Sequence, residues 1–334
     1  MTEISIVKPR ISVIIPVKNE AAKIAKCIDS ILKQSVPVFE ILALDSGSDD
    51  GSLDIMQNYD LVKVIPIPPD EFNHGQTRNL GVEVSSGDYC LLTVGDAEAY
   101  DEKWIENLMA GFTDEEVVAV CGQQVVAHLN ENNPVEWFRP VSEPRIRSFQ
   151  FDKSHFNSLS PEEKKKVCSW DDVTAIYKRD VLLEIPFRRT SYAEDAQWAK
   201  DAILKGKKIA YNPAARVYHY HLADPEFAFK KSFTVFYHLY QFFGLMPKRE
   251  EMSVMKKARI LKLLWISKGI SLAEMMSWYS YNISLNKGVN RAVETFLTLL
   301  KSGEEALNKY HEKEFSKPPV PVKSHMKEVK SGRS

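Results

Sequence analysis

Short apolar runs alternate with helical patterns through the first third of the chain. The β-branched run at residues 11–17 is typical of a strand buried on both faces, and a helical pattern follows it at 20–34. Similar apolar runs lie at 40–44, 62–67, 89–94 and 117–122, with helical stretches between them at 51–59, 76–86 and 101–112. Strands that alternate with helices predict βαβ units and a mostly parallel central sheet, so we expect an α/β fold.

Polar residues follow the predicted strands, where open parallel sheets bind their ligands. Lys18, Asn19 and Glu20 follow the first strand, and Asp45 and Ser46 follow the second. An aspartate in this place can accept hydrogen bonds from a base or a ribose. The alternative is that the segment after the second strand is only a turn and a helix cap, since Asp, Ser and Gly favour both.

Asp96 and Glu98 follow the apolar run that ends at residue 94. Two carboxylates separated by one residue can face the same divalent cation, and Mg²⁺ or Mn²⁺ favours such oxygen ligands. The same spacing also occurs by chance in solvated loops. His219 and His221 end a strand-like run at 215–220 and share one face, so they could complete the coordination of the metal or contact phosphate, or be ordinary packed or surface residues.

Glu194 and Asp195 begin a predicted helix. The helix dipole favours acidic residues there in any protein. Adjacent helical side chains point about 100° apart, so one of the two can orient a substrate while the other takes a proton. Upstream, Arg78 lies one turn into another predicted helix and could contact phosphate; alternatively, Asn73 merely caps that helix and Arg78 is solvated.

Composition and missing motifs exclude several classes of protein. The chain has 334 residues, 44% of them hydrophobic, so it can bury a sizeable core. No GxGxxG or GxxxxGK[ST] motif follows the first strand, which disfavours dinucleotide-binding dehydrogenases and P-loop enzymes. A net charge of -1 gives no case for nucleic acid as a partner. Four scattered cysteines and an N-terminus without an apolar signal region predict a cytoplasmic protein.

Charge divides the chain into an acidic and a basic part. Residues 226–334 hold 19 Lys and Arg against 10 Asp and Glu, whereas residues 1–225 hold 25 against 35. The basic part opens with aromatic residues at helical spacing, which are usually core but could also contact a membrane: Phe229, Phe233, Phe236, Tyr240 and Phe243. We hypothesise a peripheral association with the anionic inner face of the plasma membrane, and a dimerisation surface (homo-oligomer) built from residues 226–310 is the alternative.

Five segments, taken in order, resemble the family 2 glycosyltransferases of the GT-A fold, particularly their bacterial rhamnosyltransferase-like branch. These segments are ISVIIPVKNE, ILALDSGSDDGS, FNHGQTRNLG, SSGDYCLLTVGDAEAYDEKW and YAEDAQWAKDAILKGKKIAYNPAARVYHYH. They cover about residues 11–225. The resemblance implies a Rossmann-like GT-A domain at 1–225 that binds a nucleotide sugar. Beyond it, aromatic-rich helical patterns predict a helical C-terminal region at 226–311, and lysines and prolines without an apolar period predict a disordered basic tail at 312–334.

The resemblance also implies an inverting transfer of a hexosyl or deoxyhexosyl group from a nucleotide-sugar donor, in cell-surface polysaccharide synthesis. The acceptor would be a hydroxyl of a glycan or of a lipid-linked acceptor. The metal would be held by Asp96 and Glu98, with His219 and His221 as further candidates, and Asp195 would be the catalytic base. The implied donor pocket contains Pro16, Val17, Asn19, Glu20, Asp45, Ser46, Arg78, Asn79, Asp96 and Glu194.

Two departures from the family pattern concern the metal and the donor. The acidic motif reads Gly-Asp-Ala-Glu, and Asp171, Asp172 and Thr174 stand where the rhamnosyl branch usually has asparagines. A non-catalytic nucleotide-sugar binding or assembly subunit on the same fold is the alternative function. A sugar nucleotidyltransferase ranks lower, because the Gly- and Arg/Lys-rich loop expected near the first strand is missing.

Overall fold

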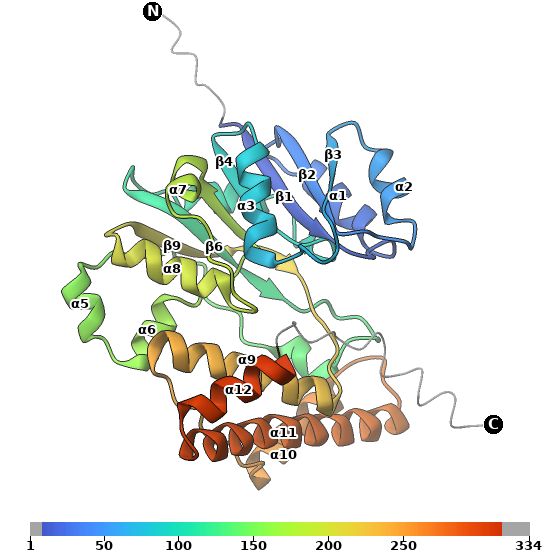
Figure 1. The fold of residues 1–334 in the computed structure, drawn as a ribbon. Coiled ribbons are helices and arrows are strands. Elements are labelled where there is room, and N and C mark those ends of the chain that lie inside the picture. The colour runs from blue at the N-terminus through green and yellow to red at the C-terminus, as the bar shows by residue number, and fades with distance from the viewer. Residues whose placement is uncertain (1–8, 316–334) are drawn as a thin grey trace, which may run out of the picture.

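The computed structural model describes residues 9–315, and within them the strands form one nine-stranded sheet (Figure 1). The predicted first strand is buried at all seven positions, as expected for a strand covered on both faces. The strands are β1 Ile11–Val17, β2 Glu40–Asp45, β3 Val62–Pro66, β4 Tyr89–Leu92, β5 Glu98–Ala99, β6 Val117–Val125, β7 Arg147–Phe149, β8 Ala175–Lys178 and β9 Lys208–Tyr218.

The strand order is β3-β2-β1-β4-β8-β6-β9-β5, and β7 also pairs with β9. β1 pairs in parallel with β2 and β4, β2 with β3, and β6 with β9. β8 lies between β4 and β6 and runs antiparallel to both. The predicted mostly parallel sheet is therefore confirmed, with β8, β5 and β7 as reversed strands that the apolar pattern did not predict. The carboxyl ends of β1, β2, β4, β6 and β9 meet at one edge.

Helices cover both faces of this sheet because its strands are apolar on both sides. Alternate residues of β1 belong to different cores: Ile14 packs with helices α3 and α8, while Val13 packs with α1 and α4. These helices and their smaller neighbours are α1 Ile24–Leu32, α2 Ser52–Gln57, α3 His74–Val84, α4 Trp104–Ala110, the 3₁₀ helix η1 Pro134–Phe138, α5 Lys153–Ser158, α6 Pro161–Val167, α7 Arg179–Glu184 and α8 Glu194–Leu204.

Four more helices form a layer beside the carboxyl edge of the sheet, in the lower part of Figure 1. They are α9 Pro225–Phe243, α10 Val254–Ile266, α11 Leu272–Lys301 and α12 Glu304–Phe315. In α9, Phe233 is fully buried and packs with Phe296 of α11 and Phe315 of α12. The core interpretation of the aromatic residues of α9 is thus correct, and they do not form an exposed surface.

Two predicted boundaries change. Residues 312–315 of the tail predicted to be disordered belong to α12, which continues to the buried Phe315; residues 316–334 lie outside the described residues. The helix predicted at 20–34 begins at Ile24, after a turn in which Asn19 adopts a positive φ of 56°. Among residues 9–315, no helix combines the length and the apolar character needed to span a bilayer.

Candidate active site

The loops that follow β1 and β2 are bonded to each other at the carboxyl edge of the sheet. Asn19 accepts a hydrogen bond from the backbone N–H of Asp49 (2.9 Å), and its own N–H donates to Ser48 (2.9 Å). Asp45 is buried at the end of β2 and accepts from the N–H of Gly47 and from the Ser48 hydroxyl. Asp45 therefore stabilises the turn after β2, as the turn interpretation of this segment predicted. The turn lies beside the other residues of the predicted donor pocket.

Those other residues line the end of β1. Pro16 and Val17 are buried in the strand, Glu20 opens the turn before α1, and Ser46 donates its hydroxyl to the Val17 carbonyl (3.2 Å). Burial and the nearby Asp96 carboxylate raise the pKa of Glu20 to about 7. The predicted donor pocket thus lies next to the loop that carries Asp96.

Asp96, His219 and His221 form a cluster whose possible ligand atoms all lie within 4.8 Å of one another. Nε2 of His219 lies 3.3 Å and Nε2 of His221 3.6 Å from the Asp96 carboxylate, and Lys23 approaches it from α1 at 3.2 Å. One carboxylate and two imidazoles suit a divalent ion. Donor-phosphate oxygens could complete the coordination, so these residues fit the predicted metal.

The protonation states of the cluster also suit a cation. Burial alone would raise the pKa of Asp96, but at the low pH where this carboxyl group titrates both rings are protonated, and the hydrogen bond and charge of His219, together with the charge of His221, hold the pKa well below its usual range. Burial and the neighbouring His219 lower the pKa of His221 to about 4, so its ring is neutral at pH 7. An ionised carboxylate and a neutral imidazole are the forms that bind metals.

Glu98 does not belong to this cluster, which corrects the expectation that Asp96 and Glu98 face one cation. Residues 98 and 99 form β5, where Glu98 pairs with Tyr218 of β9 and its side chain is exposed. Because side chains alternate along a strand, the pairing of β5 directs Glu98 away from the buried side, where Ala97 lies. The histidines take the place that the sequence assigned to Glu98.

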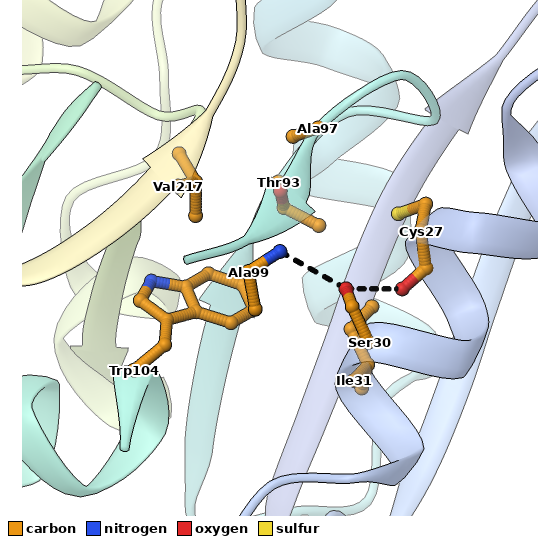
Figure 2. A pocket seen from close by; sticks show the side chains of 8 residues that line it. All are labelled: Cys27, Ser30, Ile31, Thr93, Ala97, Ala99, Trp104 and Val217. Carbon is orange, nitrogen blue, oxygen red and sulfur yellow. Dashed lines mark hydrogen bonds between the residues drawn. The ribbon is translucent and has the colours of Figure 1, made fainter. Parts of the chain in front are cut away.

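Packed side chains from α1 and α4 support the loop that carries Asp96. Figure 2 shows Ser30 of α1 between the backbone N–H of Ala99, from which it accepts a hydrogen bond (3.0 Å), and the carbonyl of Cys27, to which it donates (2.8 Å). Trp104 packs beside them and donates to the Thr174 hydroxyl (2.8 Å). The remaining space between these side chains is too small for a water molecule, so this region supports the loop and binds nothing.

Gln124, near the end of β6, connects the histidine cluster to a group of buried acids. Its Oε1 lies 2.8 Å from Nδ1 of His219, and its Nε2 donates to the Asp171 carboxylate. Sequence reasoning missed Gln124, although its place near the carboxyl end of a strand is the signal that identified Asp45 and Asp96. Asp171 lies in a segment recognised only as a departure from the family pattern.

Arg78 is buried and ion-paired, so the interpretation that it is solvated is wrong, whereas its contact with the donor phosphate stays a prediction. Its guanidinium is buried and pairs with Glu194 and with Asp172 (3.4 Å). Asn79 is likewise used internally, donating to the Phe187 carbonyl and accepting from its N–H, both at 2.9 Å. The predicted cap on α3 is present, since Asn73 accepts from the N–H of Gln76 (3.2 Å). The segment 72–81 therefore holds α3 against the start of α8.

Asp195 lies in the first turn of α8, after Ala193 with a positive φ of 57°. Burial and the negative charges of Glu194 and of Asp172 raise the pKa of Asp195 well above its usual value; Asp171 acts in the same direction. Glu194 differs, because its bond to Arg78 lowers its pKa against the effect of burial. Of these two neighbouring carboxylates, Glu194 is paired with Arg78, whereas Asp195 has no cationic partner among residues 9–315 and has a raised pKa.

Comparison with known proteins agrees with this architecture. Residues 12–166 match the family model described as glycosyl transferase family 2. The O-antigen chain rhamnosyltransferase RfbN of Salmonella typhimurium is 30% identical over 230 residues, which cover 67% of this chain and 70% of RfbN. WbaN of Salmonella anatum, also named an O-antigen chain rhamnosyltransferase, is 29% identical over 233 residues, with the same two coverages.

A solved structure shows the same fold. The crystal structure of S. aureus TarS has a TM-score of 0.50 and 16% sequence identity to this chain, covering 86% of this chain and 55% of that one. The GT-A glycosyltransferase fold implied by the five sequence segments is therefore present. Together, the match to the family model and the extent of similarity to RfbN show that the chain belongs to glycosyl transferase family 2.

Proposed function

We propose that this family 2 glycosyltransferase is an inverting, metal-dependent enzyme that moves a sugar from a nucleotide-diphosphate donor to a hydroxyl of a glycan or lipid-linked acceptor. The observation that carries the proposal is a continuous path from Asp96 through His219 and Gln124 to Asp171, which lies close enough to Asp195 to raise its pKa. This path connects a cation-binding cluster with an unpaired, basic carboxylate. Displacement of a nucleoside diphosphate needs both of these elements.

Asp195 acts as the general base in this proposal. An acceptor hydroxyl must lose its proton as it attacks the anomeric carbon, and a carboxylate is a better base when its pKa is raised towards neutrality. The acids around Asp195 provide that increase. Attack on the face opposite the leaving group inverts the anomeric centre.

Asp96, His219 and His221 would hold a divalent ion, Mg²⁺ or Mn²⁺. When bound, such an ion supplies positive charge that stabilises the departing phosphate. Pro16, Val17 and Glu20 line the nucleotide side of the pocket. The ion pair of Arg78 with Glu194 stabilises the start of α8, and so the position of Asp195.

A deoxyhexose such as rhamnose is our first candidate for the transferred sugar, because RfbN and WbaN are named as rhamnosyltransferases. Synthesis of a cell-surface polysaccharide is the corresponding process. We also propose a cytoplasmic location, which is supported by four buried thiols, Cys27, Cys90, Cys121 and Cys168, each without a disulfide.

The Asp195→Asn variant tests the role of the base. We expect it to abolish transfer while donor affinity, measured by calorimetry with Mn²⁺ present, stays near that of the wild type. Asp201→Asn is the matched control, because Asp201 lies two turns further along α8 and pairs with Arg188. Near-normal turnover of Asp195→Asn would refute the assignment.

The alternative, a binding or assembly subunit without catalysis, makes a different prediction for the wild-type protein. An enzyme releases the nucleoside diphosphate from its donor slowly in the presence of Mn²⁺ and water, and faster with an acceptor. A panel of UDP-, GDP- and dTDP-sugars, followed by release of the diphosphate, separates the two. Tight binding of one donor without any release would favour the subunit.

A further inference from the structure

The outer face of α10 is apolar. Val254 is 82% exposed and Trp265 77% exposed, values that are unusual for side chains of this size. They share a helical stripe with Ala258 and Leu261, since the spacings of four, three and four residues place all four on one side. Met255 (83% exposed) and Ile266 (47%) lie beside this stripe. We call these six residues the α10 stripe.

The opposite side of α10 already has its partners. Leu264 is fully buried and clusters with Trp278 and Tyr281 of α11, and Ile260 packs against the same cluster. An ordinary surface helix buries one apolar side and exposes polar residues on the other. Because α10 is apolar on both sides, packing within the described chain does not explain the α10 stripe.

Basic residues flank the α10 stripe. Lys256, Lys257, Arg259 and Lys262 are all exposed, and the helix contains no acidic residue. Lys256 is paired with Glu250 (2.7 Å), outside the helix. The combination of a tryptophan-containing apolar face with lysine and arginine at its sides is characteristic of helices that lie in the interface of a bilayer.

We propose that α10 docks this protein on a membrane surface rich in anionic lipids, with the α10 stripe inserted at the boundary between headgroups and acyl chains. A second copy of the chain is a poorer occupant, since two α10 helices would bring like charges together, whereas anionic headgroups complement them. Leu272 and Met276, at the start of α11, are also exposed and apolar. The aromatic residues of α9, which are buried or half-buried, have no part in this surface. The proposal does not depend on the transfer reaction.

Vesicle flotation with the full chain tests the proposal. We expect binding to vesicles of phosphatidylcholine and phosphatidylglycerol in equal amounts, weaker binding in high salt, and little binding to phosphatidylcholine alone. The double variant Val254→Ser with Trp265→Ser should weaken binding by at least about tenfold, because it removes two strongly exposed apolar side chains from the α10 stripe. Replacing Lys257 and Lys262 by Glu should weaken binding and remove its salt dependence.

Matched controls replace exposed apolar residues elsewhere. Val84→Ser on α3 and Leu183→Ser on α7, which are 47% and 45% exposed in the wild type, should leave vesicle binding unchanged. All variants should unfold at the wild-type temperature and keep wild-type donor turnover with a water-soluble acceptor, because none of the changed side chains lies in the site. This readout separates a failure of membrane docking from a failure of the proposed reaction.

Three results would overturn the proposal. The first is no binding to the anionic vesicles, and the second is binding that the α10 variants leave unchanged. The third is a dimer, seen by analytical ultracentrifugation, that Trp265→Ser dissociates; this would assign the α10 stripe to self-association.

Discussion

Gln124 and His219 fix each other's orientation, with 2.8 Å between Oε1 of the amide and Nδ1 of the ring. An ionised carboxylate such as that of Asp171 can only accept, so the amide nitrogen of Gln124 must face Asp171 and its oxygen must face the ring. In its neutral form His219 therefore carries its proton on Nδ1, and the lone pair is on Nε2, on the side of Asp96. A ring held in this tautomer is ready to bind a cation.

Gln124→Met should weaken Mn²⁺ binding by about 10- to 100-fold, since the loss of such outer partners lets a metal-binding ring rotate and change tautomer. Calorimetry, or the electron paramagnetic resonance signal of free Mn²⁺, measures this directly and needs no donor. Gln123→Met is the control, because Gln123 accepts from the N–H of Ser142 instead. Unchanged Mn²⁺ affinity in Gln124→Met would show that the ring is held by other contacts.

The pH dependence of transfer should report the raised pKa of Asp195. A base works only when ionised, so kcat should rise with pH through a value above the ordinary range near ~4 for aspartate. Asp171→Asn removes one of the negative charges that raise this pKa, and should move the rise to lower pH. The measurement is kcat against pH with metal and donor saturating.

Glu20→Gln controls for a carboxyl group of the predicted donor pocket whose pKa is raised to about 7. The Glu20→Gln variant can lower kcat by changing the donor pocket, but the pH at which kcat rises should stay the same as in the wild type. A rise at the same pH in Asp171→Asn and in the wild type would contradict the assignment of the base.

The parts of the fold that sequence predicted are those with a long or continuous local signal. The seven buried residues of β1 and the apolar runs of β2 and β4 define the parallel half of the sheet, and the rule about carboxyl ends then identifies Asp45 and Asp96. β8 has four residues and β5 has two, too few for a period to be recognised. Their pairing depends on neighbours that fold from distant segments.

The prediction for Glu98 and the interpretation of Arg78 as solvated differ from the structure for the same reason, since contacts with distant segments decide them. The spacing of Asp96 and Glu98 allows a shared cation, but the pairing of β5 with Tyr218 decides that only Asp96 faces the histidines. Arg78 has the sequence context of a phosphate contact, but its acidic partner Glu194 lies 116 residues away. Local sequence predicted the kinds of groups at this site, whereas contacts between distant segments determine which of them meet.

Arg78→Met should destabilise the protein strongly. Arg78 lies between Glu194 and Asp172, and all three side chains are buried, so removing the guanidinium leaves carboxylates without their cation. Breaking a buried pair in this way costs about 3–5 kcal/mol of the free energy of unfolding. Urea unfolding of the variant and of the wild type measures this loss of free energy.

Arg188→Met is the matched control for that change. Arg188 is 62% exposed and pairs with Asp201 at 2.7 Å. Exposed pairs contribute about 0–1 kcal/mol, so the control should lose little stability. Similar losses in the two variants would mean that the buried acids find other partners or bind protons when Arg78 is absent.

Asp195→Asn should make the protein more stable at neutral pH while it abolishes transfer. The folded protein raises the pKa of Asp195, so ionising this group above its unfolded value near ~4 costs stability, and the cost grows as pH rises towards the folded pKa. The neutral amide avoids that cost.

The melting temperature of the variant should therefore exceed that of the wild type at pH 7, and the difference should shrink as pH falls towards 4, where the wild-type carboxyl group is protonated in the folded state. Asp201→Asn, which loses the ion pair with the exposed Arg188, should show no such gain. A variant less stable than the wild type at pH 7 would mean that ionised Asp195 is stabilised by its surroundings, and then its role as an unpaired base would have to be abandoned.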